Sequence, residues 1–306
     1  MRKISVVWTL VCLLLFQGLI LLGKENSKIP ALVSAEWLKK NLKNPKLVLI
    51  EVSKKKYYDQ GHIPGSVHGY AMEFFNYKEK NGVLYEAITE KKVLEKNLQK
   101  LGVNQDSHII LIWNGKHPKE VYNATKAYFV LSGYGIPASI LNGGVWAWKK
   151  AGYPLVKEVP KVKKGNIRIE QDFRKGFLAK MDEVLKFPLR IDSRPKDFYL
   201  GKKKKKYVAK RGTIMDSINI PFTSFLNKDG TFKKAEEIKK ILSKYYQLKR
   251  EKKGVIFCNS GSTASIDWFV LKTFGGKTFS LYDGSLNEWA KYPKNPVEIP
   301  SQGGIK

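Results

Sequence analysis

Cysteine is scarce in this chain of 306 residues, which contains only two, Cys12 and Cys258. Cys12 lies in an apolar N-terminal stretch, so Cys258 is the single thiol in the rest of the sequence. One thiol excludes an intrachain disulfide framework in that part. A lone thiol is more often a buried, inert residue than a nucleophile, so its surroundings must decide its role.

Histidine and acidic residues are also few. The four histidines and the one remaining cysteine show no ligand spacing, so we expect no metal site. Acidic residues number 27 against 56 basic ones, a formal net charge of +29. Such a charge attracts phosphates, acidic lipid headgroups or small oxyanions. The alternative is a generally lysine-rich surface, because the basic residues are spread along the chain. The dense block at 202–206 fits a solvated loop.

Several binding signatures are missing from the sequence. It contains neither a phosphate loop nor a dinucleotide fingerprint, so we expect no nucleotide cofactor. It also lacks a groove-reading motif and an aromatic-basic repeat. Charge alone therefore supports a nucleic-acid or membrane-surface protein, and we expect no nucleic-acid partner. Salt-dependent binding to nucleic acid at physiological ionic strength would revive that hypothesis.

The N-terminal 26 residues have the pattern of an export segment. Two basic residues precede an apolar run over 4–22. Gly23, with Leu21 two residues before it, can substitute for the missing Ala-x-Ala cleavage site. The run is also long enough to span a membrane, so a cleaved signal and a retained anchor both remain open. We expect the rest of the chain to be periplasmic or anchored on the outer side of the cytoplasmic membrane.

The sequence after this segment contains an internal repeat. Three blocks recur in the same order at an offset of 140 to 150 residues, which chance explains poorly. The most similar pair begins with alanine and ends with an aromatic residue followed by Phe-Val-Leu. The matched blocks are 61–68 with 212–219, 124–131 with 264–271, and 141–144 with 282–285.

Each copy alternates between strand and helix patterns. Short apolar, β-branched runs are typical of buried strands in a parallel sheet. They occur at 47–50, 108–112, 189–191 and 255–257. Helical patterns lie between them, such as 234–246, where four apolar residues share one face. This predicts α/β domains, each a mainly parallel sheet with helices on both faces. We place the domains at 30–155 and 173–300, joined by a linker at 156–172.

Cys258 stands where the apolar run 255–257 ends, and a loop of small residues leads from it into a helix. Ligands of open α/β sheets bind beyond the carboxyl ends of the strands. Small residues let several backbone N–H groups converge on one point, and the following helix presents its positive end there. We expect Cys258 to be a reactive thiolate in this setting, and the same cradle suits a persulfide.

This loop resembles the active-site loop of rhodaneses and mercaptopyruvate sulfurtransferases. In that family a cysteine is followed by two variable residues, a glycine, one residue and a threonine, matching Cys258, Gly261 and Thr263. Other segments are also similar to the family's signatures and extend the resemblance over roughly residues 30 to 300. They are 61–66, which resembles a Gly-His-Ile-Pro-Gly-Ala turn, 143–155, and 282–298.

The resemblance implies two tandem rhodanese-like domains and a double-displacement reaction. Cys258 would take the outer sulfur of an anionic donor as a persulfide and pass it to a thiophile, a thiol or cyanide. Backbone N–H groups of the loop, from Asn259 through Gly261 and Ser262 to Thr263, would hold the charged sulfur. No cofactor is implied.

In the mercaptopyruvate branch of the family a loop serine and a first-domain histidine assist proton transfer. Ser260 and His62 match those positions. The acidic partner that some members add is not evident, because Ser53 and three lysines fill that stretch. The alternative for His62 is a turn histidine with a structural hydrogen bond.

Arg194 completes an Asp-x-Arg segment that resembles the family's donor-binding arginine. It would clamp the donor anion with a bidentate fork. The alternative is a salt bridge with Asp192. A second arginine often stands just before a phenylalanine in the family, but here Asp197 precedes Phe198. The anion site is therefore expected to be weaker or differently built.

The first copy has no thiol at the matching position, which falls near Trp113 or Asn114, and its loop is about five residues longer. We therefore expect a non-catalytic first domain that forms one wall of the cleft. The neutral pair Asn259 and Ser260 favours 3-mercaptopyruvate as donor, because thiosulfate-preferring relatives tend to carry basic residues there. The strong positive charge keeps thiosulfate open.

Two other functions use the same fold. A phosphatase would need an arginine six residues after the cysteine, and Ala264 occupies that position. A binding or persulfide-carrier module without turnover remains the alternative, since the departures around Arg194 leave the donor site in question.

Overall fold

The apolar runs of the first repeat form a five-stranded parallel sheet. The computed structural model describes residues 29–80 and 83–301. The strand order is β1-β7-β6-β2-β3, and every pairing is parallel. The strands are β1 (Leu32–Val33), β2 (Leu47–Glu51), β3 (Val67–His68), β6 (His108–Ile112) and β7 (Ala138–Leu141). The central strand β6 is fully buried from Ile109 to Ile112, as a sheet covered on both faces requires.

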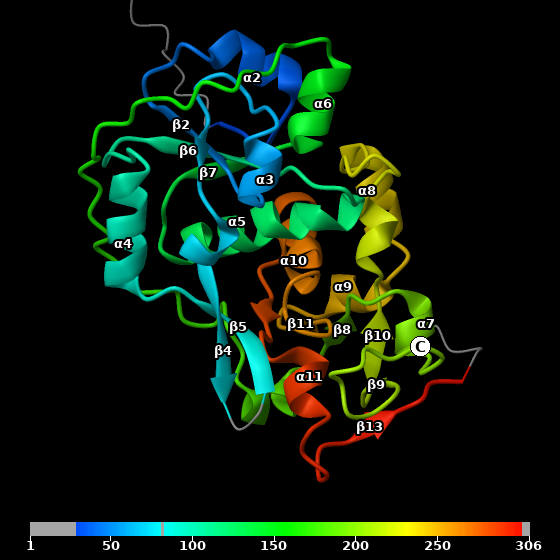
Figure 1. Ribbon diagram of the computed structural model, residues 1–306. Coiled ribbons are helices and arrows are strands. Elements are labelled where there is room, and N and C mark those ends of the chain that lie inside the picture. Colours follow the sequence, from blue (N-terminus) through cyan, green and yellow to red (C-terminus); the bar gives the residue numbers. More distant parts are fainter. Residues whose placement is uncertain (1–28, 81–82, 302–306) are drawn as a thin grey trace, which may run out of the picture. The chain divides into compact units, whose positions relative to one another are not determined.

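Helices cover both faces of this sheet. In Figure 1 strands β2, β6 and β7 lie between α2 and α6 on one side and α5 on the other. These helices are α2 (Ala35–Asn41), α5 (Tyr122–Gly133) and α6 (Gly144–Lys150). Two more helices lie later in the first domain: α3 (Lys55–Tyr58), which follows β2, and α4 (Lys91–Lys100), which precedes β6. Helix α4 buries Leu94 and Leu98, the single apolar stripe of an otherwise charged helix.

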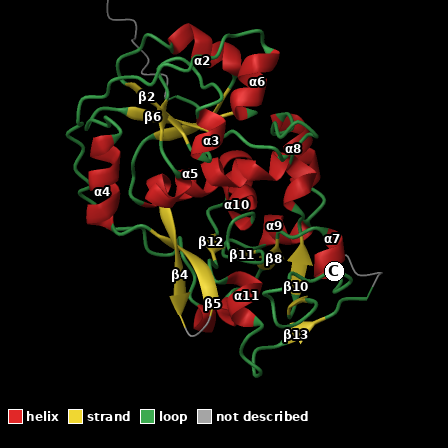
Figure 2. Cartoon of the chain, viewed as in Figure 1, coloured by secondary structure: helices red, strands yellow, loops and turns green. Residues whose placement is uncertain are grey.

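The second repeat forms a smaller parallel sheet of the same kind. Its order is β10-β8-β11-β12. In Figure 2 helix α10 lies on one side of these strands and α11 on the other. The strands are β8 (Arg190–Asp192), β10 (Ser217–Asn219), β11 (Val255–Phe257) and β12 (Ser280–Leu281). The helices are α7 (Lys196–Tyr199), α8 (Ala235–Leu242), α9 (Tyr246–Arg250), α10 (Ala264–Phe274) and α11 (Ser285–Trp289).

The matched helices α5 and α10 pack against each other between the two sheets. Both are apolar nearly all round and are buried along most of their length, as expected for helices enclosed by protein. Their aromatic rings meet edge to face: Tyr128 with Phe269 at 5.0 Å, and Phe129 with Trp268 at 4.8 Å between centroids. The repeat thus supplies the two halves of one core, and the described residues from Ala31 onward form a single compact unit.

Two antiparallel pairs were not predicted from the sequence. Strands β4 (Phe75–Lys80) and β5 (Val83–Ile88) form a hairpin in the first domain, and in Figure 1 its β5 arm lies beside α11 of the second. Strands β9 (Thr213–Ile214) and β13 (Val297–Glu298) pair at the end of the chain. The hairpin therefore brings the backbone of the first domain next to α11 of the second.

The predicted fold class is confirmed: each repeat is a parallel sheet with helices on both faces. The predicted strands 108–112 and 255–257 coincide with β6 and β11. The single helix predicted over 234–246 is wrong, because it divides into α8 and α9. Ser243 ends α8 and donates its hydroxyl to the Lys240 carbonyl, a local bond that competes with helix continuation.

The linker predicted at 156–172 has no regular secondary structure and packs on the first domain. Its Ile167 and Ile169 are buried, and the Gly165 N–H donates to the Gln99 carbonyl at 2.8 Å. The predicted export segment, residues 1–26, lies outside the described residues. Among residues 29–80 and 83–301 no helix combines the length and apolar character needed to cross a membrane.

Candidate functional site

Cys258 lies at the carboxyl end of β11, with only 2% of its surface exposed. The loop that follows reaches α10 within five residues. Gly261 has a φ of +82°, the left-handed conformation that glycine adopts without steric cost. The side chains of the other loop residues are half-buried, so small reactants can approach the loop. The position is the one predicted: a thiol just beyond a buried parallel strand.

Ser285, at the start of α11, holds this loop in place. Its hydroxyl oxygen accepts the backbone N–H groups of Cys258 and Gly261, both at 3.0 Å, and donates to the Tyr282 carbonyl at 2.8 Å. Ser285 itself has a φ of +51°, which is rare for a residue with a side chain. Strained backbone of this kind concentrates at functional sites, and here it aims the hydroxyl at two amides.

The predicted loop contacts are only partly those seen. The Gly261 N–H is bound to Ser285, so Gly261 contributes a turn rather than a sulfur-binding amide. The hydroxyl oxygens of Ser260 and Ser262 lie 3.4 Å apart. The side-chain oxygen of Asn259 is buried and has no hydrogen-bond partner among the described residues. The amides of Asn259, Ser262 and Thr263 remain predicted sulfur-binding groups.

An ion pair lies directly behind the loop. Asp283 contacts Gly261 so closely that a Cβ added to this glycine would stand 2.4 Å from the carboxylate Oδ1. The same oxygen pairs with the ammonium of Lys126, a fully buried residue of α5 in the first domain. Burial raises the pKa of Asp283, and the Lys126 charge partly offsets this effect. Sequence reasoning did not single out Lys126 or Asp283.

Arg194 is engaged in the alternative arrangement considered above, a salt bridge with Asp192. Its Nε and Nη2 contact the two carboxylate oxygens of Asp192 at distances from 2.5 to 3.1 Å. Nη2 also donates to the Gly212 carbonyl at 2.7 Å, and the side chain is 2% exposed. The fork predicted to clamp a donor anion thus already grips a carboxylate and a carbonyl. Donor binding by Arg194 stays a prediction.

His62 is likewise held by its own domain. Each ring nitrogen lies within hydrogen-bond distance of a backbone carbonyl oxygen, that of Tyr58 at 3.2 Å and that of Glu158 at 3.1 Å. The ring stacks on Tyr58 with centroids 3.8 Å apart and is fully buried. This geometry is that of a structural turn histidine, and a role in proton transfer stays a prediction.

The first domain repeats the geometry of the Cys258 loop without a thiol. In the first domain the N–H of the residue after Gly144 donates to the Trp113 carbonyl oxygen at 3.0 Å. In the second domain the N–H of the residue after Ser285 donates to the Cys258 carbonyl oxygen at 3.1 Å. The φ angles of Gly144 and Ser285 are +54° and +51°. Trp113 therefore stands in the place of Cys258, one of the two positions inferred from the sequence.

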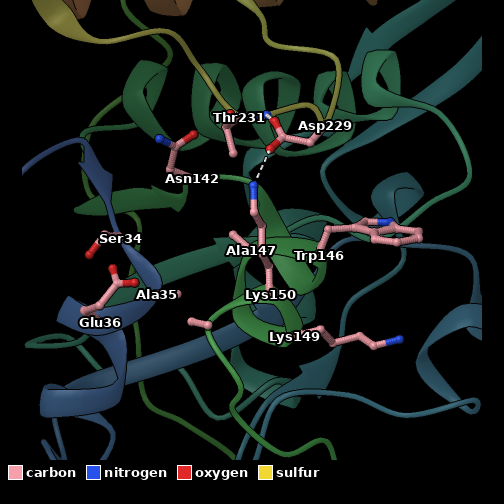
Figure 3. Close-up of a pocket in the computed structure, with 11 residues that line it drawn as sticks. Ser34, Ala35, Glu36, Asn142, Trp146, Ala147, Lys149, Lys150, Asp229 and Thr231 are labelled. Carbon is pink, nitrogen blue, oxygen red and sulfur yellow. Dashed lines mark hydrogen bonds and ion pairs between the residues drawn. The ribbon is translucent and has the colours of Figure 1, made fainter.

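An open pocket of about 670 Å³ lies elsewhere between the domains (Figure 3). Trp146 and Lys150 of α6 form one side, and Asp229 and Thr231 of the second domain form the other. Lys150 and Asp229 pair across it at 3.5 Å, with both side chains exposed. Cys258 does not line this pocket, so the pocket gives no evidence about the chemistry of the Cys258 thiol.

Comparisons with known proteins match this architecture. The family described as "Rhodanese-like domain" matches residues 34–151 and 177–292, so the chain belongs to that family and carries its domain twice. This confirms the predicted family and its tandem arrangement.

Two relatives have names that describe sulfur chemistry. "Sulfur carrier protein TtuD" of Thermus thermophilus is 29% identical over 285 residues, 87% of this chain and 95% of the relative. "3-mercaptopyruvate sulfurtransferase" of Escherichia coli is 26% identical over 286 residues, 87% of this chain and 97% of the relative. The comparisons therefore associate the chain with sulfur transfer as a class.

A solved structure shares the fold. The "anaerobic ergothioneine biosynthesis enzyme from Chlorobium limicola" superposes with a TM-score of 0.75 at 22% identity, covering 90% of this chain and 71% of that one. At this identity the likeness concerns the fold alone.

Proposed function

We propose that this protein is a sulfurtransferase that carries sulfane sulfur on Cys258 from an anionic donor to a thiophilic acceptor. The observation that carries the proposal is the loop geometry: a thiol at the end of β11, its backbone held by Ser285, at the N-terminal side of α10. Backbone dipoles and the positive helix end favour an anionic sulfur at this point.

The reaction has two displacements. The Cys258 thiolate attacks the outer sulfur of thiosulfate; the cysteine–sulfur bond forms, the donor's sulfur–sulfur bond breaks, and sulfite leaves with the electron pair. An acceptor such as cyanide then attacks the outer persulfide sulfur, so thiocyanate leaves and the thiolate returns. With 3-mercaptopyruvate a carbon–sulfur bond breaks instead, and the departing enolate of pyruvate needs a proton. Ser260 and His62 are the proposed sources of that proton.

The test is multiple turnover with each donor, with cyanide as acceptor, beside a Cys258→Ser variant. We expect thiocyanate to accumulate over many equivalents of protein and to disappear in the variant. The ratio of kcat/KM for the two donors then identifies the preferred one. Absence of turnover with both donors would refute the enzyme proposal.

A persulfide carrier without turnover is the second candidate, and two observations favour it. The Arg194 fork is already bound to Asp192, and one relative is named as a sulfur carrier. A carrier would gain the mass of one sulfur on Cys258 from a donor and would hold it, without multiple turnover, until a partner protein took it. A mass gain of one sulfur on the intact chain, combined with absence of multiple turnover in the assay above, would identify the carrier.

We also propose that residues 1–26 direct export of the chain. The support is the sequence pattern alone: basic residues, an apolar run and a small residue after it. Fusion of this segment to a reporter that is active only outside the cytoplasmic membrane tests it. Activity of the fusion supports export, and a reporter that stays inactive refutes it.

A further inference from the structure

We propose that Lys126, from the first domain, is a positioning residue for the sulfur-carrying loop of the second. Its charge offsets that of Asp283, so that the loop keeps a favourable field for an anionic sulfur on Cys258. The inference rests on the proposed function, because it explains how an inactive domain contributes to the chemistry of the other. It also gives the first domain a role beyond forming one wall of the cleft.

Lys126 is an unusual residue for its place. Its side chain is fully buried in α5, and the ammonium lies about 6 Å from the ring centroids of Phe75 and Phe129. A buried ammonium is costly unless an opposite charge compensates it, and Asp283 supplies that charge across the domain boundary. In the second repeat the matching position is Ile266, so the core of this fold does not require a cation there.

Asp283 connects this cation to the sulfur site. Its carboxylate and its backbone carbonyl both abut Gly261: an added Cβ there would lie 2.4 Å from Oδ1 and 2.8 Å from the carbonyl oxygen. Two residues later Ser285 binds the amides of Cys258 and Gly261. The turn that contains Asp283 and Ser285 therefore contacts both Lys126 and the Cys258 loop.

The local charges explain why Lys126 is needed. Asp283 faces Lys126 from α5 and Glu288 from α11, and Glu288 accepts the Tyr282 hydroxyl at 2.7 Å. Burial raises the pKa of Asp283, Lys126 lowers it, and Glu288 raises it. Without Lys126 an uncompensated carboxylate would lie against the loop that must hold a negative sulfur. In a poorly hydrated site such a repulsion acts over several ångströms.

The test measures alkylation of Cys258 by iodoacetamide as a function of pH in the full-length chain. Mass spectrometry of the tryptic peptide 254–272 separates this thiol from Cys12. Lys126→Met should move the half-maximal pH upward, and Asp283→Asn should move it downward. Each shift should change the alkylation rate near neutral pH by about tenfold, the effect of one pH unit. The double variant should return close to the parent.

Opposite shifts distinguish a charge effect from damage to packing, which would move both single variants the same way. Lys126→Arg should restore the parent profile. Lys150→Met is the matched control, because Lys150 also pairs across the domains but is exposed to solvent. Thermal unfolding confirms that each variant is folded at the assay temperature. The inference is overturned if folded Lys126→Met keeps the parent profile, or if Asp283→Asn shifts in the same direction.

The alkylation assay needs neither donor nor acceptor, so it is separate from the proposed function. Opposite shifts without turnover in the parent would retain the Lys126 inference and reject the sulfurtransferase. Turnover in the parent with unchanged profiles would reject the inference alone.

Discussion

Ser260 is a half-buried hydroxyl two residues after Cys258, and its chemistry would matter for only one of the two donors. The enolate that leaves 3-mercaptopyruvate must be protonated, whereas sulfite leaves thiosulfate as a stable anion. We therefore expect Ser260→Ala to lower kcat with 3-mercaptopyruvate by about 100-fold, the lower range for general acid catalysis. Turnover of thiosulfate should fall less than threefold. Parallel steady-state assays check this, and equal losses with both donors would exclude a proton-transfer role.

Asp267 in α10 is a fully buried acid of the second domain. Neither carboxyl oxygen has a hydrogen-bond partner among the described residues. Burial raises the pKa of Asp267 well above its usual range, and the nearby charge of Asp192 acts in the same direction. The nearby Ser193 side chain lowers this pKa, but by less than burial raises it. Folding therefore favours the protonated form of Asp267 relative to the unfolded chain.

This burial has a consequence for stability. In the unfolded chain Asp267 titrates near its ordinary value of 3.8. Above that pH the unfolded state releases a proton that the folded state keeps, so the free energy of unfolding falls as pH rises until the raised pKa is reached. Asp267→Asn should raise the free energy of unfolding at pH 8, because the neutral amide has no proton to lose when the chain unfolds. The difference in unfolding free energy between the variant and the parent should shrink toward pH 4. Urea unfolding at both pH values measures it, and a pH-independent difference contradicts it.

Single residues show where sequence reasoning succeeds and where it stops. The position of Cys258 follows from local pattern, because a strand, a short loop and a helix are contiguous in the chain. Lys126 and Asp283 are 157 residues apart, so only the packed domains bring them together. Ser285 belongs to a recognisable segment, but its hydrogen bonds to the loop depend on a positive φ that sequence does not announce.

At the scale of elements, the β11–α10 loop and the β12–α11 turn fit together through Gly261. An alanine there would combine a left-handed backbone with a clash against the Asp283 carbonyl oxygen at 2.8 Å. We expect Gly261→Ala to lower turnover at least tenfold, because the loop must move to accommodate the added methyl group. Gly276→Ala is the control: its φ is also positive, but nothing lies within 4 Å of the added carbon.

Gly276→Ala should lower the free energy of unfolding by about 1 kcal/mol, because alanine disfavours the left-handed conformation. It should leave kcat unchanged. Circular dichroism melts and steady-state assays of both variants separate strain from clash. If both alanine variants lower turnover equally, the close contact of Gly261 with Asp283 does not explain the loss of turnover.

Elements differ in how far sequence determines them. The buried strands β6 and β11 were predicted to the residue, since each is a short apolar run rich in β-branched residues. The helix break at Ser243 was missed, because the apolar spacing continues through it while a side-chain bond ends the helix. The two-residue strands β9 and β13 lie 83 to 85 residues apart and have no local signal of their own.

At the scale of the whole molecule, the two repeats have one loop with a thiol and one matching loop without it. Trp113 fills the thiol position, Gly144 replaces the clamping serine, and five extra residues lengthen the loop. The first domain nevertheless contributes half of the central core through α5. The first repeat therefore lacks a thiol but keeps the helix that packs against α10.

Charge is also a property of the whole molecule. A net charge of +29 attracts a dianion more strongly than a monoanion, and salt weakens this attraction as the Debye length falls from about 30 Å at 0.01 M to about 8 Å at 0.15 M. We expect this increase in ionic strength to lower kcat/KM for thiosulfate about tenfold and for 3-mercaptopyruvate about threefold, with kcat unchanged. Dithiothreitol, which is uncharged at neutral pH, serves as acceptor so that only the donor step responds. Equal salt dependence for both donors would mean that the charge keeps the protein soluble but does not guide the donor to Cys258.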